Sequence, residues 1–404
     1  MTKVEIYCNQ AARPDVPAAG FQPESRLPFE THRSLPGYSP TELRCCPELA
    51  ALLGVRTVLV KDESERLRLP SFKILGASWA ALTIVHAAWG DEIEGPLTLE
   101  KVRASIGSGD GRSLVAATDG NHGRGIARVA ALLGLDATIL IPTGSSQARI
   151  DAIASEGAEV QVVDGTYDDA IAASARLADE GHLVVSDTSW EGYEAAPRLV
   201  VEGYSTMFFE IDDSIVERGL PKPDVLALQA GVGAFAAAGL RHYRDGRGIP
   251  PATVVVEPSS ANCLMASARA GGLTMVPGPH MSSMAGLNCG MPSGLVWPVL
   301  AAGTDLFVAI PDEYADRAMR ALAEVGIVSG ESGAAGLGGL LALVDHGTVQ
   351  ERSRAGLHEE ACVLVVNTEG ATDPANYEEV VGRSAADVAS ARDRLAAGSA
   401  ATHH

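Results

Sequence analysis

The chain has 404 residues, of which 46% are hydrophobic and 20% charged, and its formal net charge is −20. This length predicts two domains, or one large α/β unit with an inserted lobe. The acidic balance, without a Lys/Arg cluster, argues against nucleic acid or an anionic membrane as a partner. No apolar run is long enough to cross a bilayer, and the residues after Met1 lack the pattern of a secretory signal. We therefore expect a cytoplasmic protein.

The six cysteines lack the paired C-x-x-C spacing of a zinc site. Adjacent Cys45 and Cys46 are poorly placed for a shared metal or a disulfide. The sequence therefore predicts no metal site and mostly free thiols.

The first fifty or so residues are rich in Pro, Arg and turn-forming residues, and we expect an arm that wraps the body. After them, short β-branched runs alternate with amphipathic, Ala-rich segments. Alternation of this kind predicts parallel sheets covered by helices on both faces, an α/β fold. The predicted strands are residues 57–60, 113–117, 137–141, 159–163, 182–186, 224–229, 253–257, 306–310 and 362–366, and the predicted helices include 123–133, 167–178, 234–243, 312–325 and 333–344.

Ligands of parallel sheets gather at the carboxyl ends of the strands, where turns lead into helices. The first unusual turn is LPSFKILG, in which Lys73 stands between Phe72 and Ile74. A partly dehydrated amine loses basicity and can attack a carbonyl, as Schiff-base lysines do. The alternative interpretation is an ordinary surface lysine.

The second turn, ATDGNHGRG, contains Asp119, Asn121 and three glycines where a helix is predicted to begin. Glycines let the backbone close around a ligand, and the free N–H groups at a helix start suit a carboxylate or phosphate. An Asp or Asn before a helix can also serve only as an N-cap.

The third turn, QAGVGAFA, begins at Gln229 and again joins a strand to a helix through glycines, so its amides could hold a phosphate. It also matches G-x-G-x-x-A, and Glu257 ends the next strand where a dinucleotide fold places its ribose acceptor. A nicotinamide enzyme is therefore an open alternative. No G-K-[ST] motif follows, which disfavours a nucleoside triphosphatase.

The fourth turn, VNTEGATDP, follows the last predicted strand and contains Thr368. Asp187, in VSDTSW, ends another strand in the same manner. Such polar side chains either line a pocket or only form turns.

Taken together, these turns describe a holder for pyridoxal phosphate. The lysine binds the aldehyde, the glycine turn binds the phosphate, and polar side chains bind the ring hydroxyl and the ring nitrogen. A nicotinamide enzyme has no use for Lys73.

From about Phe29 to Glu379 the chain resembles the fold-type II pyridoxal phosphate enzymes, which are tryptophan synthase beta-like, and among them the diaminopropionate ammonia-lyases. The resemblance implies two parallel-sheet αβα domains, the smaller inserted in the larger. It places the large domain at residues 1–75 and 190–404 and the small domain at 76–189, in a homodimer. Within Ser71-Phe72-Lys73, it makes Lys73 the Schiff-base lysine. The other cofactor-binding residues that it implies are Phe72, Asn121 at the ring hydroxyl, Gly231, Val232, Gly233, Ala234 and Phe235 at the phosphate, and Thr368 at the pyridine nitrogen.

The resemblance to the ammonia-lyase subfamily depends on the second turn. Serine and threonine dehydratases of this fold carry Ser-x-Gly-Asn there, whereas this chain has Thr118-Asp119-Gly120-Asn121. Asp187, GESGAAGLGG and NTEG also resemble the ammonia-lyases. One departure is Ala371, which stands where the subfamily has an acidic residue.

The implied reaction is α,β-elimination of 2,3-diaminopropionate to pyruvate and ammonia through an aminoacrylate. Lys73 would take the Cα proton of an L-substrate and Asp119 that of a D-substrate, while Asp187 would bind or protonate the leaving amine. A serine/threonine-type dehydratase, a β-replacement enzyme and a dinucleotide-dependent oxidoreductase are the alternatives. Some relatives pair the cysteines at positions 263 and 289; here we expect Cys263 and Cys289 as free thiols.

Overall fold

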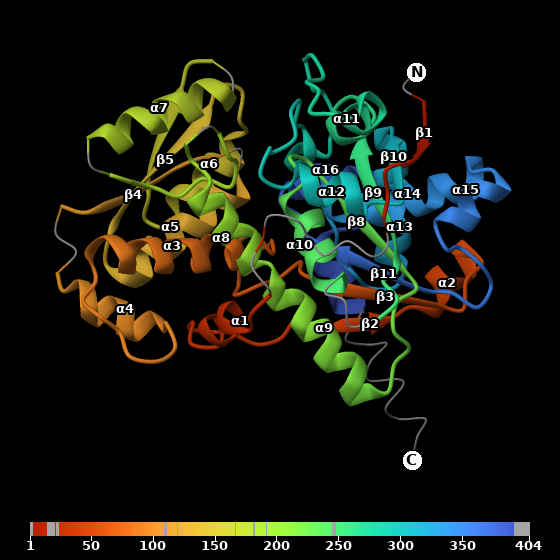
Figure 1. The fold of residues 1–404 in the computed structure, drawn as a ribbon, viewed down its shortest axis with the longest axis horizontal. Coiled ribbons are helices and arrows are strands. Elements are labelled where there is room, and N and C mark those ends of the chain that lie inside the picture. Colours follow the sequence, from red (N-terminus) through yellow and green to blue (C-terminus); the bar gives the residue numbers. More distant parts are fainter. Residues whose placement is uncertain are drawn as a thin grey trace.

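Two β-sheets organise the chain, and each is flanked by helices (Figure 1). The computed structural model describes residues 3–13, 21, 24–108, 111–118, 120–165, 167–180, 182–190, 192–244 and 248–391. The larger sheet has seven strands in the order β1 (Glu5–Cys8), β10 (Leu306–Ile310), β9 (Ala252–Pro258), β8 (Val225–Gln229), β11 (Cys362–Asn367), β3 (Thr57–Asp62) and β2 (Leu43–Cys45). The smaller sheet has four, in the order β6 (Glu159–Val163), β5 (Asp136–Pro142), β4 (Ser113–Ala117) and β7 (Leu183–Val184).

Parallel pairing dominates both sheets, as the alternating pattern predicts. The smaller sheet is parallel throughout. In the larger sheet the five central strands, β10, β9, β8, β11 and β3, run parallel. All nine predicted strands are present, with ends that differ by a few residues. The fold class predicted from the sequence is therefore present.

The N-terminal segment, which we expected to wrap the body as an arm, contains two edge strands that the sequence did not predict. β1 pairs antiparallel with β10, and β2 pairs antiparallel with β3, so the two strands form the opposite edges of the larger sheet. Every residue of β1 is half-buried, so neither face of this edge strand is fully covered. β2 has only three residues, too few for a pattern.

The helices connect successive strands and cover the sheets. In Figure 1, α3 to α7 surround the smaller sheet on the left, and most of the remaining helices surround the larger sheet on the right. None of the described helices is both long and apolar enough to cross a membrane. Their bounds are α1 Leu27–His32, α2 Pro47–Leu53, α3 Ile74–Trp89, α4 Leu99–Ile106, α5 Asn121–Leu133, α6 Gln147–Ala154, α7 Tyr167–Asp179, α8 Ala195–Gly203, α9 Ser205–Arg218, α10 Ala234–Tyr243, α11 Cys263–Ala270, the 3₁₀ helix η1 Ala285–Leu287, α12 Trp297–Gly303, α13 Asp312–Glu324, α14 Glu331–His346, α15 Val349–Arg354 and α16 Pro374–Val381.

Strand β8 shows how the larger sheet buries both faces. Leu226 and Leu228 belong to the hydrophobic cluster that includes residues of α3, α8 and α10, whereas Val225 and Ala227 belong to the cluster of α13 and α14. Side chains alternate across a strand, so a run that is apolar at every position is covered on both sides. The first cluster also includes Leu114 of the smaller sheet. One core therefore extends from one sheet to the other, and the predicted domain boundaries at residues 75 and 190 stay a prediction.

Helices α3 and α8 cross through two glycines. A Cβ atom added to Gly203 would lie 2.5 Å from the carbonyl oxygen of Leu75 and 2.9 Å from the Cα atom of Gly76. A Cβ atom added to Gly76 would lie 2.6 Å from the ring of Tyr204. The two helices approach this closely because neither residue has a side chain at the crossing.

Candidate active site

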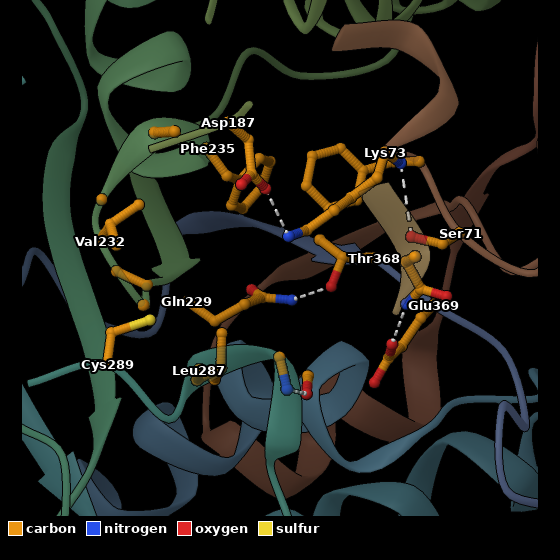
Figure 2. A pocket seen from close by; sticks show the side chains of 18 of the residues that line it. Ser71, Lys73, Asp187, Gln229, Val232, Phe235, Leu287, Cys289, Thr368 and Glu369 are labelled. Carbon is orange, nitrogen blue, oxygen red and sulfur yellow. Dashed lines mark hydrogen bonds and ion pairs between the residues drawn. The ribbon is translucent and has the colours of Figure 1, made fainter. Parts of the chain in front are cut away.

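Several turns that the sequence singles out converge on one cavity of about 170 Å³ (Figure 2). They lie where β8 leads toward α10, where β11 ends, where α3 and α5 begin, and beyond β7. Carboxyl ends of parallel strands meet at one edge of a sheet, which explains the convergence. The lining residues are Ser71, Phe72, Lys73, Asn121, Asp187, Thr188, Tyr204, Gln229, Ala230, Gly231, Val232, Gly233, Ala234, Phe235, Ala285, Gly286, Leu287, Asn288, Cys289, Ser332, Thr368 and Glu369.

Lys73 lies at the start of α3, and its side chain is 20% exposed. Its Nζ atom donates a hydrogen bond to Oδ2 of Asp187 at 2.9 Å, and the Asp187 side chain is 11% exposed. Burial alone would raise the pKa of Asp187, but the Lys73 ammonium outweighs burial, and with a smaller effect of His122 the pKa falls to about 2. Asp187 is therefore a carboxylate at neutral pH while Lys73 is beside it.

Two turns far apart in the sequence are joined beneath Lys73. Phe72 N–H donates to the Thr368 carbonyl at 3.1 Å, and Gly370 N–H donates to the Pro70 carbonyl at 3.0 Å. These backbone bonds form an isolated antiparallel bridge between Ser71 and Glu369. The lysine turn is thereby fixed to the end of β11.

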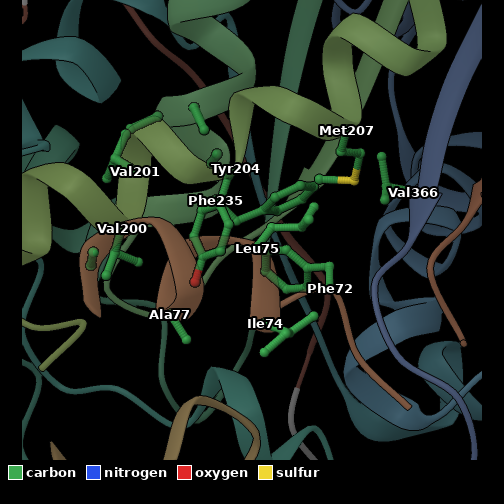
Figure 3. Packing of buried hydrophobic residues seen from close by; sticks show 14 of the residues in the cluster. Phe72, Ile74, Leu75, Ala77, Val200, Val201, Tyr204, Met207, Phe235 and Val366 are labelled. Atoms are coloured by element: carbon green, nitrogen blue, oxygen red, sulfur yellow. The ribbon is translucent and has the colours of Figure 1, made fainter. Parts of the chain in front are cut away.

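Aromatic packing holds the other side of the lysine turn (Figure 3). The Phe72 ring lies 4.6 Å from the Tyr204 ring and 5.1 Å from the Phe235 ring, measured between centroids. Phe72 is 6% exposed. Since Phe235 lies in the first turn of α10, this packing couples the lysine turn to the glycine turn.

The glycine turn between β8 and α10 requires two of its glycines. A Cβ atom at Gly231 would lie 2.8 Å from Cys289 Sγ, and Gly233 has φ +99°, with a Cβ position only 2.4 Å from Leu300. Within the described part of the chain, the N–H groups of residues 231–233 donate to no recorded acceptor. Unsatisfied N–H groups at a helix start form an anion site.

Gln229 fixes the hydroxyl of Thr368. Its side-chain Nε2 lies 3.1 Å from the Gly333 carbonyl, 3.0 Å from the Val366 carbonyl and 2.8 Å from Thr368 Oγ1. The two carbonyls can only accept, so they determine which end of the amide is nitrogen. Thr368 Oγ1 is then an acceptor from Gln229, and its own hydrogen is left for an acceptor in the cavity.

Asn121 begins α5 and donates through Nδ2 to Glu369 Oε2 at 2.8 Å. Burial and the neighbouring Glu331 raise the pKa of Glu369 to about 7, although hydrogen bonds from Ser332 and Asn121 favour the charged form. An amide nitrogen carries two hydrogens, so Asn121 keeps one for a further acceptor.

Sequence reasoning missed the roles of Gln229 and Glu369, although both lie in the turns that it quoted. The signal for Gln229 is a polar residue that ends the otherwise apolar strand VLALQ and is 2% exposed. The contribution of residues 285–289 to the cavity has no comparable signal, because the loop is distant in sequence from every other lining residue.

The structure does not bear on every predicted site residue in the same way. Asp119 lies outside the described residues. Cys263 and Cys289 are unbridged in the structure. Among the described residues there is no cluster of three or more His, Cys, Asp or Glu side chains that could hold a metal ion.

The residues present fit pyridoxal phosphate on each of its functional groups. The cavity offers a mostly buried amine for the aldehyde and unsatisfied amides for the phosphate. A hydroxyl with a free hydrogen suits the ring nitrogen, and an amide hydrogen suits the ring hydroxyl. The glycine turn also needs glycine at residue 231, since a Cβ there would collide with the loop of residues 286–289 that lines the same cavity.

Comparisons with known proteins agree with this fit. A family model described as "Pyridoxal-phosphate dependent enzyme" matches residues 35–365. The chain belongs to this family. It is 38% identical over 387 residues to the diaminopropionate ammonia-lyase of Escherichia coli strain K12, covering 94% of this chain and 96% of that protein.

Solved structures give the same result for the fold. The crystal structure of holo diaminopropionate ammonia lyase from Escherichia coli superposes with a TM-score of 0.85 at 37% identity, covering 94% of this chain and 96% of that one. The same enzyme in complex with an aminoacrylate-PLP azomethine reaction intermediate has a TM-score of 0.84 at 36% identity, covering 94% and 97%.

Membership of the pyridoxal-phosphate dependent enzymes confirms the predicted fold type and the predicted cofactor, and the dinucleotide alternative is wrong. Glu257 explains why the G-x-G-x-x-A match misled. It is fully buried, and its two carboxylate oxygens accept from the N–H groups of Leu264 and Met265 at the start of α11. It is a helix-capping residue of its own strand-to-helix turn, without a surface to offer a ribose.

Proposed function

We propose that this protein converts 2,3-diaminopropionate to pyruvate and two molecules of ammonia. The observation that carries the proposal is the ion pair of Lys73 with Asp187, which stands in the same cavity as the glycine turn. It supports the proposal because an amine that would bind the cofactor aldehyde lies beside a carboxylate that would bind a cationic substrate. The similarity to diaminopropionate ammonia-lyases along nearly the whole chain supports the choice of substrate.

We assign the binding of the cofactor to the residues that match its groups. Lys73 would bind the aldehyde, with Phe72 packed beneath it, and Asn121 would donate to the ring hydroxyl oxygen. Thr368, held by Gln229, would donate its hydrogen to the ring nitrogen. The phosphate would rest on the amides of Gly231, Val232, Gly233, Ala234 and Phe235.

When bound, pyridoxal phosphate supplies an electron-withdrawing ring that acidifies the substrate Cα proton. The amine of Lys73, once released, takes that proton from an L-substrate. For a D-substrate, whose proton lies on the opposite face, we assign the base to Asp119 on the sequence resemblance alone.

We assign Asp187 to holding the 3-amino group of the substrate. That group enters as an ammonium and would replace the Lys73 ammonium beside Asp187, so the same attraction would keep Asp187 a carboxylate that binds a cation and has no proton to give. An ammonium that leaves takes the electrons of its bond to the β-carbon and departs as neutral ammonia. Elimination then needs no further acid, and hydrolysis of the remaining enamine gives pyruvate and the second ammonia.

A substrate panel tests the proposed function. The purified protein should show a visible absorption band that borohydride removes, and it should release ammonia and pyruvate from diaminopropionate faster than from serine or threonine. Lys73→Ala should abolish the band and the turnover, and Asp119→Ser should remove turnover of the D-enantiomer. Asp187→Asn should keep the absorption band. Its kcat/KM for diaminopropionate should fall at least ten times more than its kcat/KM for serine. Faster turnover of serine or threonine by the unaltered protein would replace this function with that of a hydroxy amino acid dehydratase.

We further propose that the protein is a cytoplasmic homodimer, on the resemblance of its sequence to the ammonia-lyases. Sedimentation equilibrium of the holoprotein should give twice the 41.9 kDa mass of the chain. A monomer at micromolar concentration would contradict this.

A further inference from the structure

A second cavity of about 310 Å³ adjoins the first. The two share four lining residues: Asn121, Ala285, Gly286 and Glu369. The mechanism assigned above uses none of the groups on its far wall. The shared residues form the boundary between the two cavities.

Opposite charges line opposite sides of the second cavity. Arg124 of α5 and Arg149 of α6 lie on the side of the smaller sheet, and Glu331 of α14 and Glu369 after β11 lie on the side of the larger sheet. A molecule that carries both a carboxylate and an ammonium matches such a cavity when it spans the two sides.

The two arginines are not equivalent. Arg124 Nε donates to Glu156 Oε1 at 3.0 Å, so its charge is already balanced. The guanidinium of Arg149 has no hydrogen-bond or ion-pair partner within the described ranges of the chain, and its Cδ atom lies 3.6 Å from the Cβ position of Gly120. Arg149 is therefore a cation placed over the turn that contains Asn121 and available to an anion.

The carboxylates face the cavity from buried positions. Glu331 and Glu369 are each 7% exposed, and Glu331 accepts a hydrogen bond from Asn376. Ala371, which also lines the cavity, contributes a methyl group and no charge. Arg149 acts on Glu369 across the cavity and favours its charged form, so the two walls carry opposite charges.

We propose that the second cavity is a receiving site for the amino-acid substrate, in which Arg149 binds the carboxylate and Glu331 and Glu369 face the amino groups. The substrate occupies this site before it reaches Lys73. The identity of the ligand rests on the proposed function, but the existence of the site does not depend on turnover.

Borohydride-reduced holoprotein provides the test. Hydride adds to the carbon of the bond between Lys73 and the cofactor and a proton to its nitrogen, so the amine of Lys73 can no longer be exchanged for the substrate. Calorimetric titration with 2,3-diaminopropionate should still show saturable binding. Arg149→Gln should weaken it by about tenfold or more, the value of one charge-assisted hydrogen bond, and Arg149→Lys should weaken it less.

Two further variants test whether the effect depends on charges inside the cavity. Arg128→Gln removes the same charge from α5 at a residue outside the cavity lining and should leave binding unchanged. Ala371→Asp adds a carboxylate to the acidic wall that faces the amino groups and should not weaken binding. In the unreduced enzyme, Arg149→Gln should raise KM while kcat changes less than threefold.

Absence of saturable binding to the reduced protein, or equal affinity of Arg149→Gln and the unaltered protein, would overturn the receiving site. A protein that turns over diaminopropionate but binds none after reduction keeps the proposed function and loses only this inference. A protein that binds it after reduction and turns none over keeps the site and loses the function.

Discussion

Lys73 illustrates how a charged side chain is kept in a mostly apolar place. Its neighbour Phe72 packs on Tyr204 and Phe235, and its ammonium is compensated by Asp187. A buried charge without a partner is costly, so the carboxylate stabilises the lysine in the absence of cofactor. When the amine is bound to the cofactor, we expect the same carboxylate to hold the amino group of the substrate, as proposed.

Gln229 and Thr368 should act as one unit in cofactor binding. Gln229→Met removes the donor to Thr368 Oγ1 and to two buried carbonyls, so we expect a loss of about 1–3 kcal/mol in stability and weaker binding of pyridoxal phosphate. Thr368→Val should weaken the binding of pyridoxal phosphate to a similar extent. Because both changes break the same chain of hydrogen bonds, the double variant should lose less affinity than the sum. Absorbance titration of the cofactor-free proteins measures this, and strict additivity would contradict the coupling.

Glu369 should make stability depend on pH. Its pKa in the folded protein is about 7, above that of an ordinary glutamate, so between about pH 5 and 8 the folded state binds more protons than the unfolded state. Stability therefore falls as pH rises through this window, by at most roughly 3 kcal/mol from this group. Glu369→Gln should flatten the dependence and gain most at pH 8. Thermal unfolding of both proteins at pH 5, 6.5 and 8 checks the sign, and a parallel pH dependence would refute it.

The close crossing of helices α3 and α8 fixes the position of the lysine turn. Lys73 immediately precedes α3, so a displacement of this helix moves the amine relative to the glycine turn. The crossing depends on Gly203, where an added side chain meets backbone atoms that cannot yield, and on Gly76, where it meets the side chains of Tyr204 and Val200. A glycine in the interior of a helix is normally unfavourable, and here helix packing explains it.

Gly203→Ala should destabilise the protein by about 1–3 kcal/mol and slow turnover, because its Cβ would overlap the backbone of α3. Gly272→Ala is the matched control, since nothing lies within 4 Å of its Cβ position. It should be neutral or slightly stabilising. Denaturant unfolding measures both, and equal midpoints would show that the crossing accommodates a methyl group.

Because one core joins the two sheets, we expect cofactor binding to stabilise both sheets together. Turns from both sheets line the cavity, so a bound cofactor holds them together. A ligand at a hundredfold over its Kd stabilises a protein by about 2.7 kcal/mol. Holoprotein should therefore unfold at a temperature several degrees above protein stripped with hydroxylamine. Identical unfolding temperatures would mean that the cavity contributes nothing to the link between the sheets.

The amino-acid sequence by itself determined the interior strands, the helices between them and the turns that carry the chemistry. Continuous apolar runs such as VLALQ and glycines before a helix are local signals, because burial on both faces and positive φ each restrict the residue types at the position itself. The lysine, the glycine turn, Asn121 and Thr368 were all predicted in this way or by resemblance, and the structure brings them to one cavity.

Tertiary structure alone decided which partners these residues have. The edge strands β1 and β2, the bond of Gln229 to Thr368, the bond of Asn121 to Glu369 and the charged second cavity join segments far apart in the chain. No local pattern encodes such a contact, since each side chain is compatible with many neighbours until the sheets pack. The same physics explains Glu257, whose place near the end of a strand resembles that of a ribose acceptor, but whose carboxylate accepts hydrogen bonds from the start of α11.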